Sequence, residues 1–328
     1  MKAAYYDRQG AARDVLVVAD AVRPEPGPGE VRVRIHVSGL NPTDTKARSG
    51  FSAAMRFARI IPHQDGAGVI DAVGDGVDAG RVGERVWVYE AQFGQASGTA
   101  ADYATVTACH AVALPDGVSF EIGACLGIPA LTAHRCLFAD GDISGRRVLV
   151  HGGAGAVGTA AILLAKWAGA WVVATVRRPE HAAAAKAAGA DLVINSRVED
   201  VAAGIRSATD GSGVDRIVDV DLLGNLDVDM ACLAQGGVIS SYAVGAADDR
   251  VPVPLLKAMM GGCVFRFVFI YTVPDDAKHS AISDITACLS AGAYRPAIGL
   301  TLPLERIIEA HEAQEAGKVI GKILLTVV

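Results

Sequence analysis

Between residues 147 and 271 the chain alternates short apolar runs with segments that carry apolar residues at helical spacing. Buried parallel strands are typical of such β-branched runs. Six runs predict strands: RVLVH (147–151), WVVATV (171–176), DLVIN (191–195), DRIVDV (215–220), GVISSYA (237–243) and VFRFVFIY (264–271). Helical segments lie between them, so this part predicts a doubly wound parallel sheet, an α/β fold of the Rossmann type.

The flanking parts of the chain have a different pattern. Val31, Val33, Ile35 and Val37 alternate with polar residues, and further short Val-rich runs are broken by Gly and Asp. This pattern predicts an antiparallel, barrel-like domain. Helices are expected over 119–138, with a break at Pro129, after Pro274 and over 304–316. The last run, VIGKILLTVV, predicts a strand that returns to the first domain. We therefore expect one domain from residues 1–121 and 271–328 and a second from 122–270.

A glycine turn follows the first predicted parallel strand. Residues 153–158, GAGAVG, fit G-x-G-x-x-G and precede a predicted helix. Strand, glycine turn and helix together favour a dinucleotide site over an ordinary glycine-rich connection. Gly153 allows the tight turn, Gly155 leaves room for a pyrophosphate, and Gly158 lets the helix approach the strand. Ala156 and Val157 complete the loop, whose N–H groups face the phosphates.

The end of the second predicted strand distinguishes between the nicotinamide cofactors. An acidic residue there would hold the ribose of NAD, but the chain has Thr175, Val176, Arg177 and Arg178 instead. Two arginines suit a 2′-phosphate, which they bind through charge-assisted hydrogen bonds. The alternative is a pair of solvated arginines at a helix start. We expect NADPH as the cofactor, with Tyr242 and Val244, after the fifth strand, at its nicotinamide end.

Composition narrows the class of protein. Apolar residues make up 51% of the 328 residues, the net charge is −6, and the six cysteines are scattered without C-x-x-C. The acidic balance argues against a general nucleic-acid surface. No apolar run approaches a membrane span, and the N-terminus lacks the apolar core of a signal peptide. We expect a cytoplasmic protein with reduced thiols, no membrane segment and no nucleic-acid partner.

Several motifs along the chain belong together: SGLNPTDT (38–45), RSG (48–50), GAGVIDAVGDGV (66–77), GIPALTA (127–133) and AHEAQEAGKVIGKILL (310–325). With these motifs the chain resembles the zinc-independent quinone oxidoreductases, the zeta-crystallin-like members of the medium-chain dehydrogenase/reductase superfamily. The resemblance covers nearly the whole chain, and SGLNPTDT is its most specific part. It implies a GroES-like barrel as the catalytic domain and a Rossmann domain for the cofactor.

The zinc-using relatives carry Cys-x-x-Asp, Gly-His-Glu and a later Cys around a catalytic metal. Here Asn41 stands at the first position, Pro62-His63-Gln64-Asp65 at the second motif and Ile128 at the third, with Cys125 nearby. One histidine and one carboxylate make a poor zinc site, which needs at least three protein ligands. We expect no metal, and we interpret His63 as a structural histidine or a pocket wall.

The resemblance also implies roles for individual residues. Asn41 donates to a substrate oxygen or to the nicotinamide ribose, and Asp44 orients neighbouring groups. Thr132 packs beside the nicotinamide, or else its hydroxyl bonds its own helix. Lys322 reaches the cofactor side in some relatives. Lys46 replaces a tyrosine common in the family. It stabilises an enolate or phenolate, delivers a proton, or points to solvent.

These patterns support NADPH-dependent reduction of a quinone, with hydride transfer from the nicotinamide C4 and no zinc. Reduction of the alkene of an enone or enoyl compound uses the same hydride geometry and stays open. A non-catalytic, crystallin-like NADPH-binding protein is the alternative from another class. The apolar run 264–271 is expected at the sheet edge, where it predicts a homodimer unless the chain's own helices cover it.

Overall fold

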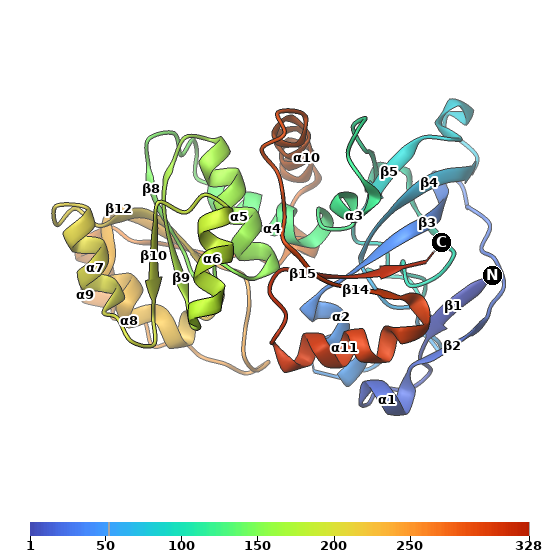
Figure 1. Cartoon of the computed structure of the whole chain (residues 1–328), viewed down its shortest axis with the longest axis horizontal. Coiled ribbons are helices and arrows are strands. Elements are labelled where there is room, and N and C mark those ends of the chain that lie inside the picture. The colour runs from blue at the N-terminus through green and yellow to red at the C-terminus, as the bar shows by residue number, and fades with distance from the viewer. Residues whose placement is uncertain (52, 328) are drawn as a thin grey trace. The chain divides into compact units, whose positions relative to one another are not determined.

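The computed structural model describes residues 1–51 and 53–327 (Figure 1). The chain forms two compact units. Unit 1 comprises Met1–Ile128 and Ile298–Val328, and unit 2 comprises Pro129–Ala297. Each unit has its own sheet and its own buried core.

Unit 2 is built on a six-stranded, fully parallel sheet. Its order is β10-β9-β8-β11-β12-β13, so the six strands taken in chain order lie 3-2-1-4-5-6. This is the Rossmann order, which confirms the fold class expected from the apolar runs. The strands are β8 (Arg147–Val150), β9 (Trp171–Val176), β10 (Leu192–Asn195), β11 (Val214–Asp219), β12 (Leu233–Ser241) and β13 (Val264–Phe267).

Helices connect these parallel strands. Apolar side chains of α5 pack in the core, where Ala161, Ile162 and Leu164 are fully buried. The helices of this unit are α4 (Gly127–Phe138, which begins in unit 1), α5 (Ala156–Trp167), α6 (Pro179–Ala187), α7 (Val201–Ala208), α8 (Leu222–Cys232), α9 (Leu255–Gly261), η3 (Ile270–Thr272) and α10 (Asp275–Ser290).

Unit 1 carries a seven-stranded sheet in which β3 is central. The path runs β14-β15-β3-β4-β5-β7, and β6 pairs separately with β3. All pairs except β14 with β15 are antiparallel. The strands are β3 (Glu30–Leu40), β4 (Asp65–Val73), β5 (Arg85–Val88), β6 (Tyr103–Thr107), β7 (Ala111–Ala113), β14 (Ile298–Pro303) and β15 (Lys322–Thr326), with β1 (Lys2–Tyr5) and β2 (Val17–Asp20) as a separate hairpin pair.

The C-terminal strand joins this sheet, as its apolar pattern predicted. Leu324 of β15 lies opposite Gly39 of β3 and is fully buried. The remaining elements of unit 1 are α1 (Ala12–Val15), α2 (Pro42–Ser49), η1 (Ala79–Arg81), η2 (Ala108–His110), α3 (Phe120–Gly123), η4 (Leu304–Arg306) and α11 (Ile307–Ala316). The break expected at Pro129 is wrong: the helix is interrupted between α3 and α4, and Pro129 lies in the first turn of α4, where proline is tolerated.

The boundary of the second unit differs from the expected one. Residues 271–297 were expected with the barrel domain, but the structure assigns them to unit 2. Helix α10 packs against α5, and its Asp284 accepts a hydrogen bond from His134 Nε2 at 2.8 Å. The apolar pattern of a helix does not indicate which sheet the helix covers, so the sequence alone could not assign α10 to a unit.

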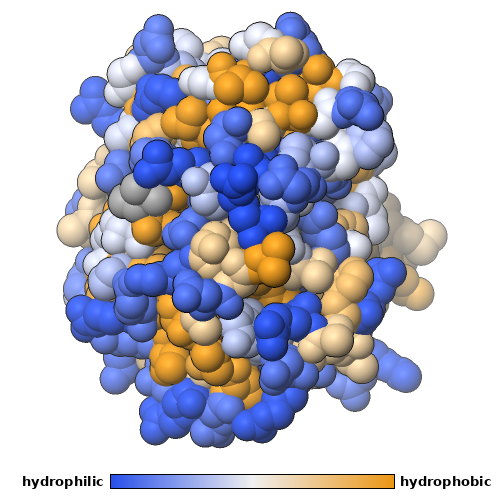
Figure 2. Space-filling model, turned by 90° about the vertical axis from the view of Figure 1, so that its right-hand side faces the viewer, coloured by the Kyte–Doolittle hydropathy of each residue, from blue (hydrophilic) through white to orange (hydrophobic). Residues whose placement is uncertain are grey.

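The edge strand β13 is also shorter than its apolar run. It ends at Phe267, and the helical turn η3 follows at Ile270. None of the helices within the described residues is long and apolar enough to cross a membrane. Figure 2 shows one face of the molecule, on which apolar side chains lie in separate groups divided by hydrophilic ones.

Candidate functional site

The glycine loop in unit 2 has the geometry that a dinucleotide phosphate requires. Helix α5 begins at Ala156, and its N-cap Gly155 provides no side-chain cap. The first N–H groups of a helix have no intrahelical acceptor, so those at Ala156, Val157 and Gly158 are available to an anion. These residues therefore fit a dinucleotide phosphate.

The three glycines of the loop are not equivalent. A Cβ at Gly158 would lie 2.2 Å from the Gly152 carbonyl oxygen, and one at Gly153 would lie 2.8 Å from the Ala174 methyl carbon. At Gly155 the only atom near such a Cβ is the Gly152 oxygen, at 3.4 Å. Gly153 and Gly158 thus serve packing, whereas Gly155 leaves open space beside the helix N-terminus, as expected for a phosphate approach.

A buried polar chain ties the start of this loop to the sheet. The Thr175 hydroxyl lies 2.9 Å from His151 Nδ1 and accepts a hydrogen bond from the Gly152 N–H at 3.4 Å. The other ring nitrogen, His151 Nε2, lies 2.8 Å from Asp229 Oδ1. Thr175, predicted as a cofactor residue, therefore holds the start of the loop through the Gly152 N–H and through the His151 ring.

Asp219 and Asp229 form a carboxyl pair beneath His151. Both are fully buried, burial raises the pKa of each to about 7, and the nearby Asp229 contributes to raising that of Asp219. Burial also lowers the pKa of His151. Burial thus favours the protonated form of the two acids and the neutral form of the imidazole. Within the described part of the chain, this is the one group of three metal-ligating side chains whose ligand atoms all lie within 4.8 Å.

The two predicted 2′-phosphate ligands already have protein partners. Arg177 Nη2 donates to Asp221 Oδ2 at 3.1 Å, and its side chain is 62% exposed. Arg178 donates to His181 Nε2 at 3.0 Å and is 3.5 Å from Glu180. The Arg177 side chain is exposed and the Arg178 side chain is 29% exposed, and the predicted role of both remains a prediction.

The residues expected after β12 lie at the carboxyl edge of the same sheet. The Tyr242 N–H donates to the Asp219 carbonyl at 3.1 Å, and Val244 is 54% exposed. Burial raises the pKa of the Tyr242 phenol. The structure thus places Tyr242 near the Asp219 end of β11, the edge where ligands of such sheets bind.

In unit 1 a buried lysine is bound by two side chains. Lys322 Nζ donates to Asn41 Oδ1 at 2.6 Å and to Asp65 Oδ2 at 2.8 Å, and Asn41 Nδ2 donates to Asp65 Oδ2 at 2.7 Å. Asp65 Oδ1 accepts the Ile128 N–H at 2.8 Å. Lys322 and Asn41 are each 2% exposed, and Asp65 is fully buried. The structure therefore joins Asn41, Asp65 and Lys322 into one set, which we call the lysine triad.

Asp44 supports this triad from the first turn of α2. Its Oδ2 accepts the Asn41 N–H at 2.7 Å, which fixes the backbone that carries the Asn41 amide. Burial and the charge of Asp65 raise the pKa of Asp44, and the N–H groups of Asn41 and Gln64 together with Lys322 lower it, which leaves it at about 8. This contact agrees with the expected orienting role for Asp44.

Lys46 lies in α2 and Thr132 in α4. The Lys46 ammonium lies 4.5 Å from the centre of the Phe51 ring, a cation–π arrangement. Thr132 is buried within α4. Their predicted catalytic and nicotinamide roles remain predictions.

The residues aligned with zinc ligands do not fit zinc. A zinc site needs at least three anionic or imidazole ligands, but the Lys322 ammonium lies within hydrogen-bond distance of both Asn41 and Asp65. His63 points elsewhere: its Nδ1 lies 2.8 Å from Ser38 Oγ and its Nε2 3.0 Å from His311 Nε2. His63 also has a φ of 79°, which costs a non-glycine residue about 1–2 kcal/mol.

Sequence reasoning missed His151, Asp219 and Asp229 as a group and the pairing of Lys322 with Asp65. His151 follows β8 and Asp219 ends β11, so polar residues at the carboxyl ends of parallel strands were the available signal. Lys322 and Asp65 lie 257 residues apart in sequence and carry no comparable local signal.

We predict that alanine at two loop glycines has different effects. Gly158→Ala places a Cβ against the Gly152 carbonyl and lowers the melting temperature. Gly155→Ala meets only van der Waals contact, so it keeps the wild-type melting temperature but loses dinucleotide affinity, measured by calorimetric titration of NADPH. A Gly155→Ala protein that binds NADPH as tightly as the wild type contradicts this assignment.

We predict that Asp229→Asn makes stability less dependent on pH. The unfolded chain loses both carboxyl protons near pH 4, whereas burial keeps the folded pair partly protonated until about pH 7, so the wild type loses stability as pH rises through this window. Asparagine still accepts from His151 but does not titrate. The variant gains in melting temperature over the wild type between pH 5 and pH 8. The exposed Asp227→Asn on the same helix is the control, and an equal gain in both variants refutes the raised carboxyl pKa.

Comparisons with known proteins agree with these two units. A family model described as alcohol dehydrogenase GroES-like domain matches residues 27–116, and one described as zinc-binding dehydrogenase matches residues 156–286. The quinone oxidoreductase of Rattus norvegicus is 31% identical over 96% of this chain and 94% of its own length.

Solved structures give the same result. The chain is similar to an Escherichia coli quinone oxidoreductase complexed with NADPH, with 26% identity, a TM-score of 0.85 and full coverage of both chains. It is also similar to an NAD-dependent alcohol dehydrogenase, with 28% identity, a TM-score of 0.90 and full coverage. With the Rossmann unit, the GroES-like unit and the relative above 30% identity, the chain belongs to the quinone oxidoreductase-type family of the medium-chain dehydrogenase/reductase superfamily, and it is an oxidoreductase.

Proposed function

We propose that this oxidoreductase uses NADPH to reduce a quinone without zinc. The observation that carries the proposal is the buried lysine triad, which provides a fixed positive charge at the residues aligned with a zinc site. The quinone oxidoreductase relatives and the NADPH complex of one of them support the substrate class and the cofactor.

When bound, NADPH supplies a hydride from its nicotinamide C4. The acceptor oxygen then develops negative charge, which hydrogen-bond donors and a cation stabilise. Lys322 has three N–H bonds, two of which are directed at Asn41 and Asp65. We assign the third, together with the second N–H of Asn41, to that oxygen. Asp65 holds both donors in place, and Asp44 holds the Asn41 backbone.

The cofactor half of the proposal rests on unit 2. The uncapped N-terminus of α5 takes the pyrophosphate, and Arg177 and Arg178 take the 2′-phosphate after exchanging Asp221 and Glu180 for it. All six cysteines are free thiols, which supports a cytoplasmic protein.

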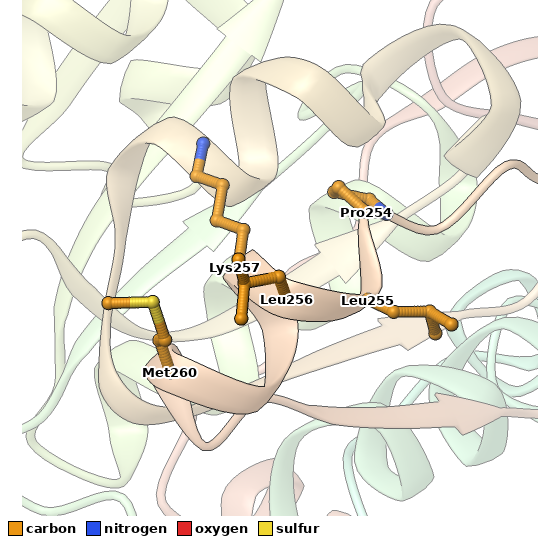
Figure 3. A pocket seen from close by; sticks show the side chains of 5 residues that line it. All are labelled: Pro254, Leu255, Leu256, Lys257 and Met260. Atoms are coloured by element: carbon orange, nitrogen blue, oxygen red, sulfur yellow. The ribbon is translucent and has the colours of Figure 1, made fainter.

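We also propose a homodimer that forms through the edge of the parallel sheet. β13 is the last strand of its sheet, and next to it in sequence α9 exposes Leu255, Leu256, Met259 and Met260, each more than 70% exposed. Figure 3 shows the apolar pocket on this helix, lined by Pro254, Leu255, Leu256, Lys257 and Met260. An apolar patch beside an unpaired edge fits a second copy of the chain.

We predict that the purified protein oxidises NADPH with benzoquinone or 9,10-phenanthrenequinone and prefers NADPH to NADH. Arg177→Ala removes a charge-assisted contact to the 2′-phosphate and lowers this preference about tenfold, a change of roughly 1.4 kcal/mol. The exposed Arg197→Ala is the control. Turnover of an enone panel without any quinone favours the alkene reductase. Tight NADPH binding without turnover favours the non-catalytic protein.

The homodimer predicts a concentration-dependent mass near twice 33.8 kDa in sedimentation equilibrium. Met259→Glu together with Phe267→Glu places charge in the patch and shifts the protein to the monomer. Val198→Glu, at another exposed apolar position of the same unit, leaves the mass unchanged. A monomeric wild type at micromolar concentration contradicts the dimer.

A further inference from the structure

Five buried polar side chains in unit 1 form one continuous hydrogen-bonded chain that the proposed reaction does not use directly. Arg48 Nε donates to His311 Nδ1 at 3.3 Å, and the two histidine Nε2 atoms lie 3.0 Å apart. His63 Nδ1 lies 2.8 Å from Ser38 Oγ, and Ser38 Oγ lies 2.8 Å from Thr99 Oγ1. Thr99 then donates to the backbone carbonyl of Asp65. All five side chains are fully buried.

The chemistry of Arg48 fixes the direction of every bond in this chain. A guanidinium only donates, so His311 Nδ1 accepts and its proton is on Nε2. His311 Nε2 therefore donates to His63 Nε2, which leaves the His63 proton on Nδ1. His63 then donates to Ser38, Ser38 donates to Thr99, and Thr99 donates to the Asp65 carbonyl. One orientation thus satisfies all members.

The geometry and charge state of the two rings agree with this direction. Their planes differ by 18° and their centres are 5.2 Å apart, so the N–H of one ring lies nearly in the plane of the other. Burial lowers the pKa of His63 well below its usual value, and burial together with the charge of Arg48 lowers that of His311 to about 3. Both rings are consequently neutral, with one proton each to donate.

The chain ends at the residue that organises the lysine triad. Asp65 is held at its backbone oxygen by Thr99 and at its carboxylate by Asn41, Lys322 and the Ile128 N–H. Two residues earlier, His63 has a positive φ, and its carbonyl accepts the Thr99 N–H at 3.1 Å. An unfavourable backbone conformation persists only where the surrounding contacts hold it in place. At His63 these contacts are the hydrogen bonds to Ser38, His311 and Thr99.

We propose that Arg48, His311, His63, Ser38 and Thr99 are positioning residues that set the backbone at Asp65 and thereby hold Lys322 and Asn41 in the geometry that reduction requires. The chain connects this site to Glu315 on the surface of α11, which is ion-paired with Arg48. The expected effect on kcat rests on the proposed function, whereas the existence of the hydrogen-bonded chain does not.

The matched pair Thr99→Val and Thr99→Ser tests the kinetic consequence. Valine keeps the shape but cannot donate to Asp65, and we expect kcat for quinone reduction to fall about tenfold while KM for NADPH changes less than about twofold. Serine keeps the hydroxyl and restores most of kcat. The exposed Thr107→Val is the control for the substitution. A Thr99→Val protein with wild-type kcat, even with a lower melting temperature, refutes the positioning role.

A second measurement needs no substrate. Nitrogen-15 NMR of the histidine rings in the wild type is expected to show His63 protonated on Nδ1 and His311 on Nε2, both unchanged between pH 5 and pH 8. The reverse tautomers, or a ring that gains a proton in this range, refute the chain. A wild type without turnover refutes the proposed function alone, because the ring nitrogens still decide whether the chain exists.

Discussion

The buried ion pair between Lys322 and Asp65 is the interaction on which unit 1 depends. It joins the last strand of the chain to the start of β4, and Asn41 bridges both partners from the start of α2. Such a pair is costly to bury and even more costly to break, because one unpaired charge would remain in the core. The local fold therefore supplies partners for both oxygens of the Asp65 carboxylate: the Ile128 N–H for Oδ1, and Asn41 and Lys322 for Oδ2.

In both units, buried neutral histidines connect polar groups that lie far apart in the sequence. In unit 2 a neutral His151 connects Thr175, and through it Gly152, to a carboxyl pair. In unit 1 two neutral histidines connect Arg48 to the backbone beside Asp65. Burial keeps each imidazole uncharged, so each ring donates with one nitrogen and accepts with the other. Buried hydrogen-bonded networks of this kind restrict the local geometry, which a phosphate loop or a polar reaction site needs.

Local patterns predicted the Rossmann unit well. The six apolar runs all form strands in the Rossmann order, because β-branched runs and the glycine turn act over a few residues. The alternating residues 31–37 and the final run likewise became neighbouring strands β3 and β15. The membership of α10 in unit 2 and the early end of β13 were not predictable, since each depends on packing partners distant in sequence.

The candidate site was predictable only in part. The glycine loop has a sequence signature, and the SGLNPTDT motif identified Asn41 and Asp44. Lys322 was expected at the cofactor side, but its pairing with Asp65 depends on β15 crossing beside β3. His63 was expected as a structural histidine, which agrees with its hydrogen bonds, yet its partner His311 is 248 residues away and no local pattern indicated the contact.

A double-mutant cycle on Lys322 and Asp65 tests the central claim most directly. The free energy of unfolding is measured for Lys322→Met, Asp65→Asn and the double variant. Each single change leaves one buried group without its charged partner and costs about 3–5 kcal/mol, whereas the double variant loses clearly less than the sum. Additive losses within about 0.5 kcal/mol would show that the two residues do not depend on each other and would contradict the account.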